Sequence, residues 1–287
     1  MSKTLRLLMP QWQGGNNPAY ALGARLLAWL APGNENTKVV EVPVEAYKGE
    51  TLALEEGVIA RSALLKQLYA AKELIEDEQP ERIIVFGGDC LVAQAPFAYL
   101  NEKYGGNLGV LWLDSHPDVS TPQMYDHVHA MVLGNLLGEG KDEGEKEFAA
   151  EVKMPIKADL IMYGGLQQTS TQEAKIINRL QLRKVGPGEL AQTSQPVLDW
   201  IKEKKIRQLA IHLDVLDPNL FRSLLFAKPE GLAIDSPSGT MTLAQIARVI
   251  KDVSQQTDVV GLAIAEHLPW DAINMQNFLE ELPIFKE

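Results

Sequence analysis

The chain has 287 residues, of which 46% are hydrophobic and 23% are charged, so it is long enough to bury a sizeable core. Its formal net charge of -11 argues against nucleic acid or an anionic membrane as a partner, because both reward clustered Lys and Arg. The single cysteine, Cys90, excludes an intrachain disulfide. Because there is no apolar run of membrane-spanning length and no signal-peptide pattern, we expect a cytoplasmic protein.

Short apolar runs alternate with helical patterns along the chain. Several runs are rich in Val and Ile and apolar on both faces, as a parallel sheet covered by helices requires. The sequence therefore predicts an α/β fold, a three-layer αβα arrangement with a doubly wound, mainly parallel sheet, in a single domain spanning residues 1–287. Strands are expected at 5–9, 38–42, 82–88, 108–114, 158–165, 208–214 and 259–267. Helices are expected at 19–30, 62–75, 128–138, 172–180 and 243–253.

Two further segments carry little regular pattern. Residues 138–158 form the most charged stretch, which favours a surface loop or an exposed helix. Residues 217–239 read as a long loop before a late helix, and loops of that length are often functional.

Acids, histidines and the single cysteine follow the ends of the predicted strands. In open α/β sheets, ligands bind outside the carboxyl ends of the strands. Four predicted strands end there in acids, imidazoles or the only thiol, and all five histidines lie in or just after these segments. The strand ends are Asp89-Cys90, Asp114-Ser115-His116-Pro117-Asp118, His212-Leu213-Asp214 and Glu266-His267, and the remaining histidines are His127 and His129.

The spacing of these residues points to a metal site. Alternate residues of an extended segment point the same way, so Asp114, His116 and Asp118 can converge, and so can His212 and Asp214. Carboxylates packed this closely repel one another unless a cation lies between them. Mixed oxygen and nitrogen ligands suit manganese, zinc, iron or cobalt. The alternative is a set of acids that cap helices or face solvent.

Four blocks of the sequence also resemble a known family. "GGDC", "DSHPD", "HLDVLDP" and "AIAEHLP", in this order and spacing, resemble the signature blocks of the arginase–agmatinase (ureohydrolase) superfamily. The resemblance implies two manganese ions bridged by a hydroxide that attacks the carbon of a guanidinium or similar C–N group. Manganese is the first expectation for the cofactor, with zinc, iron or cobalt as alternatives and one or two ions bound. It also implies a homo-oligomer, a trimer or hexamer, acting on a small molecule.

Residue by residue, the resemblance assigns roles. Asp114, His116 and Asp118 match the second block in full, and the resemblance implies that Asp118 is required for catalysis as a ligand. Glu266 matches the acid that pairs with the guanidinium of the substrate. His129 matches a loop histidine that shuttles protons, a role that suits a pKa near neutrality. The alternative for His127 and His129 is an exposed position at the start of a helix, and His267 is expected to be structural.

Two positions depart from the family pattern. Cys90 stands where the first block has a histidine ligand. The third block has two possible alignments. Anchored on 215–218, His212 replaces a bridging acid and Asp214 is the second acid. Anchored on the strand, Asp214 is the bridging acid and Asp217 could be drawn inward.

The first alignment preserves the formal charge of the ligands. Cys90 adds a negative charge if the thiol ionises at the metal, and His212 removes one. The site would become softer and would tolerate zinc, iron or cobalt better than a manganese-only cluster. The alternative for Cys90 is a small buried apolar residue.

The residues expected at the far end of the substrate differ as well. The arginases of the family carry an asparagine just after the second block and an acid in the loop after the next strand. Here Ser120 and the segment "GGLQQTSTQE" (164–173) take those places, and we expect no charged partner for an α-amino group. The sequence therefore disfavours L-arginine and favours another guanidino, N-hydroxyguanidino, ureido or amidine compound.

The sequence thus predicts a metal-dependent hydrolase of a linear, non-peptide C–N bond. The metal would be held by Asp114, His116, Asp118 and Asp214, with Cys90 and His212 as variable ligands. An alternative is a catalytically impaired relative with a binding or regulatory role. A dinucleotide-dependent oxidoreductase is disfavoured, because "QGGNNPAYALG" lacks the G-x-G-x-x-G spacing.

Overall fold

The computed structural model describes residues 3–33, 38–139, 147–231 and 236–281. The described residues form an eight-stranded sheet in the order β2-β1-β5-β10-β9-β6-β7-β8, in which all neighbours are parallel. Its strands are β1 (Thr4–Met9), β2 (Val39–Glu41), β5 (Arg82–Gly87), β6 (Leu108–Asp114), β7 (Ile161–Gly164), β8 (Arg183–Val185), β9 (Gln208–Asp214) and β10 (Asp258–Ile264). A short antiparallel pair, β3 (Leu54–Glu55) and β4 (Val58–Ile59), lies apart from it.

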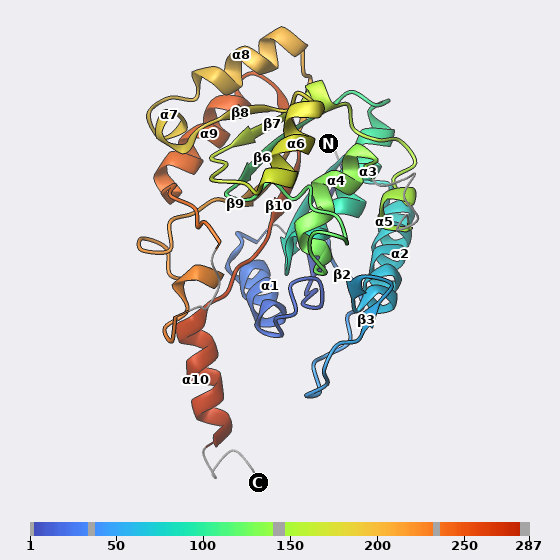
Figure 1. Ribbon diagram of the computed structural model, residues 1–287, viewed down its shortest axis with the longest axis vertical. Coiled ribbons are helices and arrows are strands. Elements are labelled where there is room, and N and C mark those ends of the chain that lie inside the picture. The colour runs from blue at the N-terminus through green and yellow to red at the C-terminus, as the bar shows by residue number, and fades with distance from the viewer. Residues whose placement is uncertain (1–2, 34–37, 140–146, 232–235, 282–287) are drawn as a thin grey trace.

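Helices cover both faces of the sheet (Figure 1). The helices are α1 (Ala19–Leu30), α2 (Arg61–Glu78), α3 (Gln94–Lys103), α4 (Val132–Leu137), α5 (Glu147–Ala150), α6 (Thr171–Arg179), α7 (Pro187–Gln192), α8 (Gln195–Lys204), α9 (Leu243–Ser254) and α10 (Trp270–Glu281). Short 3₁₀ turns are η1 (Cys90–Ala93), η2 (Val128–Met131), η3 (Ala158–Leu160) and η4 (Leu225–Ala227).

Strand β6 shows why the sheet needs two helical layers. Every residue of β6 is buried. Val110 and Trp112 pack in one core cluster with residues of α2, α3 and α4, and Leu111 and Leu113 pack in the opposite cluster with residues of α7, α8 and α9. Because successive side chains of a strand point to opposite faces, an unbroken apolar run of this kind requires cover on both sides. The predicted three-layer α/β fold with a parallel sheet is confirmed.

Local sequence signals fix several helix ends. Ser170 and Glu173 form a reciprocal capping box at the start of α6, and Thr242 and Gln245 form another at the start of α9. Helix α10 extends away from the body of the molecule (Figure 1). Within the described ranges, no helix combines the length and the apolar character needed to cross a membrane.

The structure differs from the sequence-based elements in detail. Strand β8, the β3–β4 pair and helices α3, α7, α8 and α10 were not among the expected elements. Of the charged segment 138–158, residues 147–150 form α5, while 140–146 lie outside the described residues. The segment 217–239 contains η4, and its residues 232–235 also lie outside them.

Candidate metal centre

Four neighbouring strands in the middle of the sheet, β5, β10, β9 and β6, carry the chemistry found in the sequence. Strands β6 and β9 pair in register, with Asp114 beside Asp214 and Trp112 beside His212. The two acids therefore emerge next to each other at the carboxyl edge. This is the edge at which open α/β sheets bind their ligands.

Six potential ligand residues form two groups that share one residue. The first, called here the inner group, consists of Cys90, Asp114, Asp118 and His212, all buried. The second, called the outer group, consists of Asp114, His116 and Asp214, of which the last two are partly exposed. Within each group the donor atoms all lie within 4.8 Å of one another. The structure thus brings together all six residues for which the sequence predicts metal binding.

Several donor atoms in these groups have no hydrogen-bond partner. Oδ2 of Asp114, Oδ2 of Asp118 and both ring nitrogens of His212 are buried without one. Nε2 of His212 does lie 3.2 Å from Oδ2 of Asp114, but this contact lacks hydrogen-bond alignment and is an ion pair only if the ring is protonated. A buried polar atom without a partner is costly. A divalent cation would give these atoms the partner they lack, so the residues fit a metal ion.

The electrostatics of the cluster lead to the same conclusion. Burial, followed by repulsion from Asp114 and Asp214, raises the pKa of Asp118 well above its ordinary value. Burial, with repulsion from Asp114, raises the pKa of Asp214 to about 8. Burial also acts to raise the pKa of Asp114, but the neighbouring imidazole rings of His116 and His212 lower it overall. The cluster thus holds its negative charges poorly on its own, and a bound cation would stabilise them.

His116 is oriented from two sides. Its backbone N–H donates to Oδ1 of Asp114 at 2.8 Å, and Nε2 of its ring lies 3.1 Å from Oγ of Ser236. Nδ1 faces Asp114, with 3.5 Å between Nδ1 and Oδ1. Burial lowers the pKa of His116, but the hydrogen bond and charge of Asp114 outweigh it and raise the pKa to about 9. Such a partner on the second nitrogen is typical of histidines that bind metals.

The segment "GGDC" (87–90) positions the thiol of Cys90. Asp89 does not point into the cluster; its carboxylate accepts hydrogen bonds from the backbone N–H of Leu91 at 3.1 Å and of Gly14 at 2.9 Å. This caps η1, which begins at Cys90. Gly88 lies so close to a neighbouring loop that a Cβ atom would lie 1.6 Å from the carbonyl oxygen of Gln11.

Cys90 and Glu266 meet at this edge. Sγ of Cys90 lies 3.7 Å from Oε1 of Glu266 and 4.0 Å from Oδ2 of Asp214. Burial raises the pKa of the thiol well above its usual value, with a further contribution from the surrounding acids. Burial also raises the pKa of Glu266 to about 8. Without a cation or a cationic ligand, both groups therefore keep their protons at neutral pH.

Two of these acids have unusual backbone conformations. Asp118 has a φ of 49° and Glu266 a φ of 59°, in the left-handed region that favours glycine. Hydrogen bonds to neighbouring chain segments hold both: Gly134 N donates to Asp118 O at 3.0 Å, and Glu266 N donates to Gly88 O at 2.7 Å. Strained conformations of this kind cluster at functional sites.

His129 lies beside the loop that follows β1. Its Nδ1 donates to the carbonyl oxygen of Gly14 at 2.7 Å, an arrangement that leaves Nε2 as an acceptor. Burial lowers the pKa of His129 to about 4. The sequence argument for a pKa near neutrality is therefore wrong for this conformation, because it did not foresee that the surrounding chain partly buries the ring.

The other two histidines outside the ligand groups have partners of their own. Nδ1 of His127 lies 2.7 Å from Oδ1 of Asp126, and its ring stacks on Tyr125 with centroids 5.0 Å apart. Nδ1 of His267 donates to the carbonyl oxygen of Gly23 at 3.1 Å, so His267 takes part in packing α1 against the segment after β10.

The sheet bears on the two alignments of the third block. His212 belongs to the inner group, and Asp214 belongs to the outer group. Asp217 is not drawn inward, because Oδ1 of its carboxylate accepts from the backbone N–H of Asn219 at 2.8 Å and from the Asn219 side chain at 3.0 Å. This arrangement agrees with the alignment anchored on 215–218, in which both His212 and Asp214 are candidate ligands.

One acid near the cluster was missed by the sequence argument. Oγ of Ser120 donates to Oε1 of Glu173 at 2.8 Å, and Oε2 of Glu173 accepts from the backbone N–H of Ser170 at 2.9 Å. Glu173 also contributes to the raised pKa of Asp118. The expectation that the segment 164–173 brings no charge to this place is therefore wrong. The S-x-x-E spacing of a capping box is the signal that could have drawn attention to Glu173.

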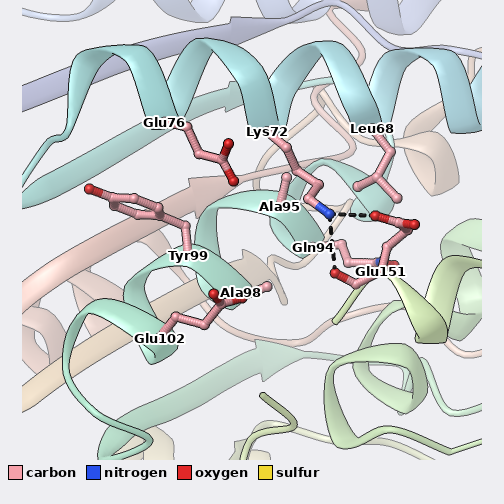
Figure 2. A pocket seen from close by; sticks show the side chains of 9 residues that line it. All are labelled: Leu68, Lys72, Glu76, Gln94, Ala95, Ala98, Tyr99, Glu102 and Glu151. Atoms are coloured by element: carbon pink, nitrogen blue, oxygen red, sulfur yellow. Dashed lines mark hydrogen bonds and ion pairs between the residues drawn. The ribbon is translucent and has the colours of Figure 1, made fainter. Parts of the chain in front are cut away.

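At least two cavities formed by the described residues lie outside the ligand groups. One, between α2 and α3, has a volume of about 30 Å³, room for a few waters but not for a substrate. Figure 2 shows Lys72 reaching across it to Glu151, and the two side chains form an ion pair. The other, about 420 Å³, lies beside α2 and is lined by Glu41, Pro43, Val44, Glu45, Ala63, Lys66 and Gln67.

A parallel αβα sheet with potential metal ligands gathered at its carboxyl edge defines the class to which the molecule belongs: α/β proteins with an arginase-like fold. The sequence model of the Arginase family matches residues 34–276. The chain belongs to the arginase family.

Individual relatives are distant. The chain is 26% identical over 196 residues to an arginase of Staphylococcus aureus (strain COL), covering 63% of this chain and 61% of that protein. It is 22% identical over 221 residues to an arginase of Coccidioides posadasii (strain C735), covering 72% and 65%. The match thus spans less than two thirds of the length of either relative.

Solved structures agree on the fold. The arginase of Entamoeba histolytica in complex with L-ornithine superposes with a TM-score of 0.76 at 18% identity, covering 94% of this chain and 92% of that one. The formimidoylglutamase of Bacillus subtilis superposes with a TM-score of 0.66 at 12% identity, covering 94% and 80%. At these identities the likeness shows the shared fold.

Proposed function

We propose that this protein is a metal-dependent hydrolase of a linear, non-peptide C–N bond in a guanidino, N-hydroxyguanidino, ureido or amidine compound. The observation that carries the proposal is the set of buried donor atoms without hydrogen-bond partners on Asp114, Asp118 and His212. They lie at the ligand-binding edge of an arginase-family fold.

The inner and outer groups would each hold one divalent ion. Asp114 would contribute to both, since it belongs to both groups. Divalent ions supply a water that is readily deprotonated at neutral pH, together with positive charge for the developing negative charge of the reaction. Manganese is the metal that family membership favours; zinc, iron and cobalt also suit the donor atoms.

Glu266 would bind the cationic end of the substrate. Its carboxyl is buried and has a pKa of about 8, so it carries little charge in the free protein at neutral pH. A guanidinium or amidinium beside it would favour the ionised form and form charge-assisted hydrogen bonds. Its position against Cys90 would hold the reacting carbon close to the ligand groups.

His129 would handle protons. With Nδ1 committed to Gly14, only Nε2 is available, and a ring with a pKa of about 4 is neutral at pH 7. In this state His129 accepts a proton rather than giving one. It would become a donor to the leaving amine only after taking up a proton during the same turnover.

Ser120 and Glu173 would contact the far end of the substrate. Both oxygens of Glu173 already accept hydrogen bonds, from Ser120 and from Ser170. Nevertheless, the carboxylate provides negative charge near the cluster. The charge argument against an α-amino group is thereby weakened, and L-arginine belongs among the compounds to be tested.

The test is a screen of these compound classes, with L-arginine included, on protein loaded with Mn²⁺, Zn²⁺ or Co²⁺. Release of urea, hydroxyurea or ammonia is expected with at least one compound and metal. A matched pair of variants serves as control: Asp214→Asn should remove the activity, and Asp217→Asn, three residues further along, should retain it. Metal binding without turnover on any compound would instead support a binding or regulatory protein.

On family membership alone, we also propose a homo-oligomer, a trimer or a hexamer. Light scattering coupled to size-exclusion chromatography would measure the mass directly, and a mass of one chain would contradict this proposal.

A further inference from the structure

The inner and outer groups offer different donor atoms. The inner group presents a sulfur from Cys90, a nitrogen from His212 and carboxylate oxygens from Asp114 and Asp118. The outer group presents a nitrogen from His116 and carboxylate oxygens from Asp114 and Asp214. Sulfur and nitrogen donors favour borderline-soft ions such as Zn²⁺, Co²⁺ and Fe²⁺, whereas sites richer in oxygen suit Mn²⁺.

The two groups also differ in completeness and in access to water. Four protein donors within 4.8 Å of one another can complete the tetrahedral shell of a zinc-like ion. All four residues of the inner group are buried, so the ion there would have little exchange with solvent. The outer group has three donors and two partly exposed residues, leaving positions for water or substrate.

His212 can bind the ion of one position only and cannot bridge the two. Its ring stacks on Trp112 with centroids 3.9 Å apart and planes inclined by 11°, which fixes the plane of the imidazole. Each ring nitrogen has a single lone pair and binds one ion, whereas a carboxylate can bind two through its two oxygens. Only Asp114 is then shared between the two groups.

We propose that the two positions are unequal: the inner one binds a Zn²⁺-class ion through the thiolate of Cys90 and fills first, and the outer one binds an exchangeable Mn²⁺-class ion. On binding, the Cys90 thiol loses its proton to solvent and its sulfur lone pair forms the bond to the metal, with no change of oxidation state. This inference rests on the metal centre of the proposed function and specifies which ion each position takes.

Cobalt(II) titration of the metal-free protein tests the inference without any activity assay. A thiolate bound to Co²⁺ gives a charge-transfer band in the near ultraviolet, in addition to the weaker visible bands of the ion. The band is expected to grow with the first equivalent and to stay constant through the second. Absence of the band, or growth through both equivalents, would overturn the inference.

Variants assign the two steps. Cys90→Ala should lose the band, and Zn²⁺ affinity at the first step should fall by more than about 100-fold, since changes outside the ligand shell already cost about 10–100-fold. Asp214→Asn should keep the band and lose the second step, while Asp217→Asn should keep both. Loss of the band in Asp214→Asn, with circular dichroism showing a folded protein, would contradict the assignment. If Cys90→Ala does not fold, Cys90→Ser provides the same readout.

Manganese identifies the outer position. After one equivalent of Zn²⁺, added Mn²⁺ should lose its free-ion electron paramagnetic resonance signal for one further equivalent, and excess Mn²⁺ should not displace the zinc. Displacement of zinc by manganese would overturn the inference. Hydrolysis without a thiolate band would refute the inference and leave the proposed function intact. An ordered two-step titration without hydrolysis would support the inference and contradict the proposed function.

Discussion

Strands β6 and β9 lie side by side and end at the same edge of the sheet, yet their ends teach different lessons. After β6, Asp114, His116 and Asp118 follow the family pattern at every second position. On β9, the corresponding end reads His212-Leu213-Asp214, with an imidazole where the alignment anchored on 215–218 expects an acid. The exchange does not alter the strand pairing, because backbone hydrogen bonds place His212 and Asp214 beside β6. What changes is the charge and the number of ions that one side chain can bind.

The largest effect is expected from the β6 end. Asp118→Ala removes a carboxylate of the inner group and should lower kcat/KM by more than about 100-fold, since alterations outside the ligand shell already cost about 10–100-fold. Steady-state kinetics at saturating metal would measure the loss. Retention of wild-type activity would remove Asp118 from the site.

Converting the β9 end to the family pattern is the next test. His212→Asp adds a fourth acid beside Asp114, Asp118 and Asp214, so the metal-free protein should melt at a lower temperature than the wild type at pH 8. Saturating Mn²⁺ should stabilise the variant more than the wild type, and each tenfold gain in affinity corresponds to about 1.4 kcal/mol. Thermal melts with and without Mn²⁺ check both. An equal response to Mn²⁺ in the two proteins would mean that His212 does not limit manganese binding.

The pH dependence of stability should distinguish the metal-free state from the loaded one. The pKa values of Asp214 and Glu266 are both raised to about 8, and that of His116 is raised from 6.5 to about 9. For each group the folded state binds more protons than the unfolded state in this range, so stability falls as pH rises from 6.5 to 9. His129, with its pKa lowered from 6.5 to about 4, acts only below this range.

Thermal melts across this pH range provide the measurement. The metal-free protein should lose stability with rising pH, and metal-loaded protein should show a flatter profile because its ligands are already deprotonated. Equal slopes with and without metal would show that these groups do not control the transition.

The smallest effect is expected from support of the outer group. Ser236→Ala removes the partner of Nε2 of His116 and should weaken the second metal-binding step by about tenfold while leaving the thiolate band unchanged. The cobalt titration would measure both. A change in the thiolate band instead would show that Ser236 supports the inner group.

The fold and much of the candidate site could be predicted from the sequence, for identifiable reasons. Continuous apolar runs such as 108–114 predict buried parallel strands, and alternation after a strand end predicts convergent side chains. Strand β8 (Arg183–Val185) was missed because it is short and two of its residues are charged. The helices missing from the expected set include α7, only six residues long.

The remaining errors concern long-range geometry. The alignment of His212 could not be decided along the chain, because it depends on which residue of β6 lies beside it. The pKa of His129 depends on burial and on a contact with Gly14, 115 positions away. Glu173 was overlooked because its helix-capping role concealed its second contact, with Ser120. Of these, only Glu173 has a local signal, the S-x-x-E spacing of its capping box; the others depend on contacts between distant parts of the chain.

Gly14 has a consequence that reaches beyond its own loop. Its N–H is held by the Asp89 carboxylate that caps the thiol turn, and its carbonyl oxygen is held by His129. This single glycine therefore connects the turn that positions Cys90 with the ring of His129. A Cβ on residue 14 would stand 2.6 Å from the Asp89 carboxylate oxygens. A larger residue at position 14 is therefore expected to disturb Cys90 and His129 together, although the two lie far apart in the sequence.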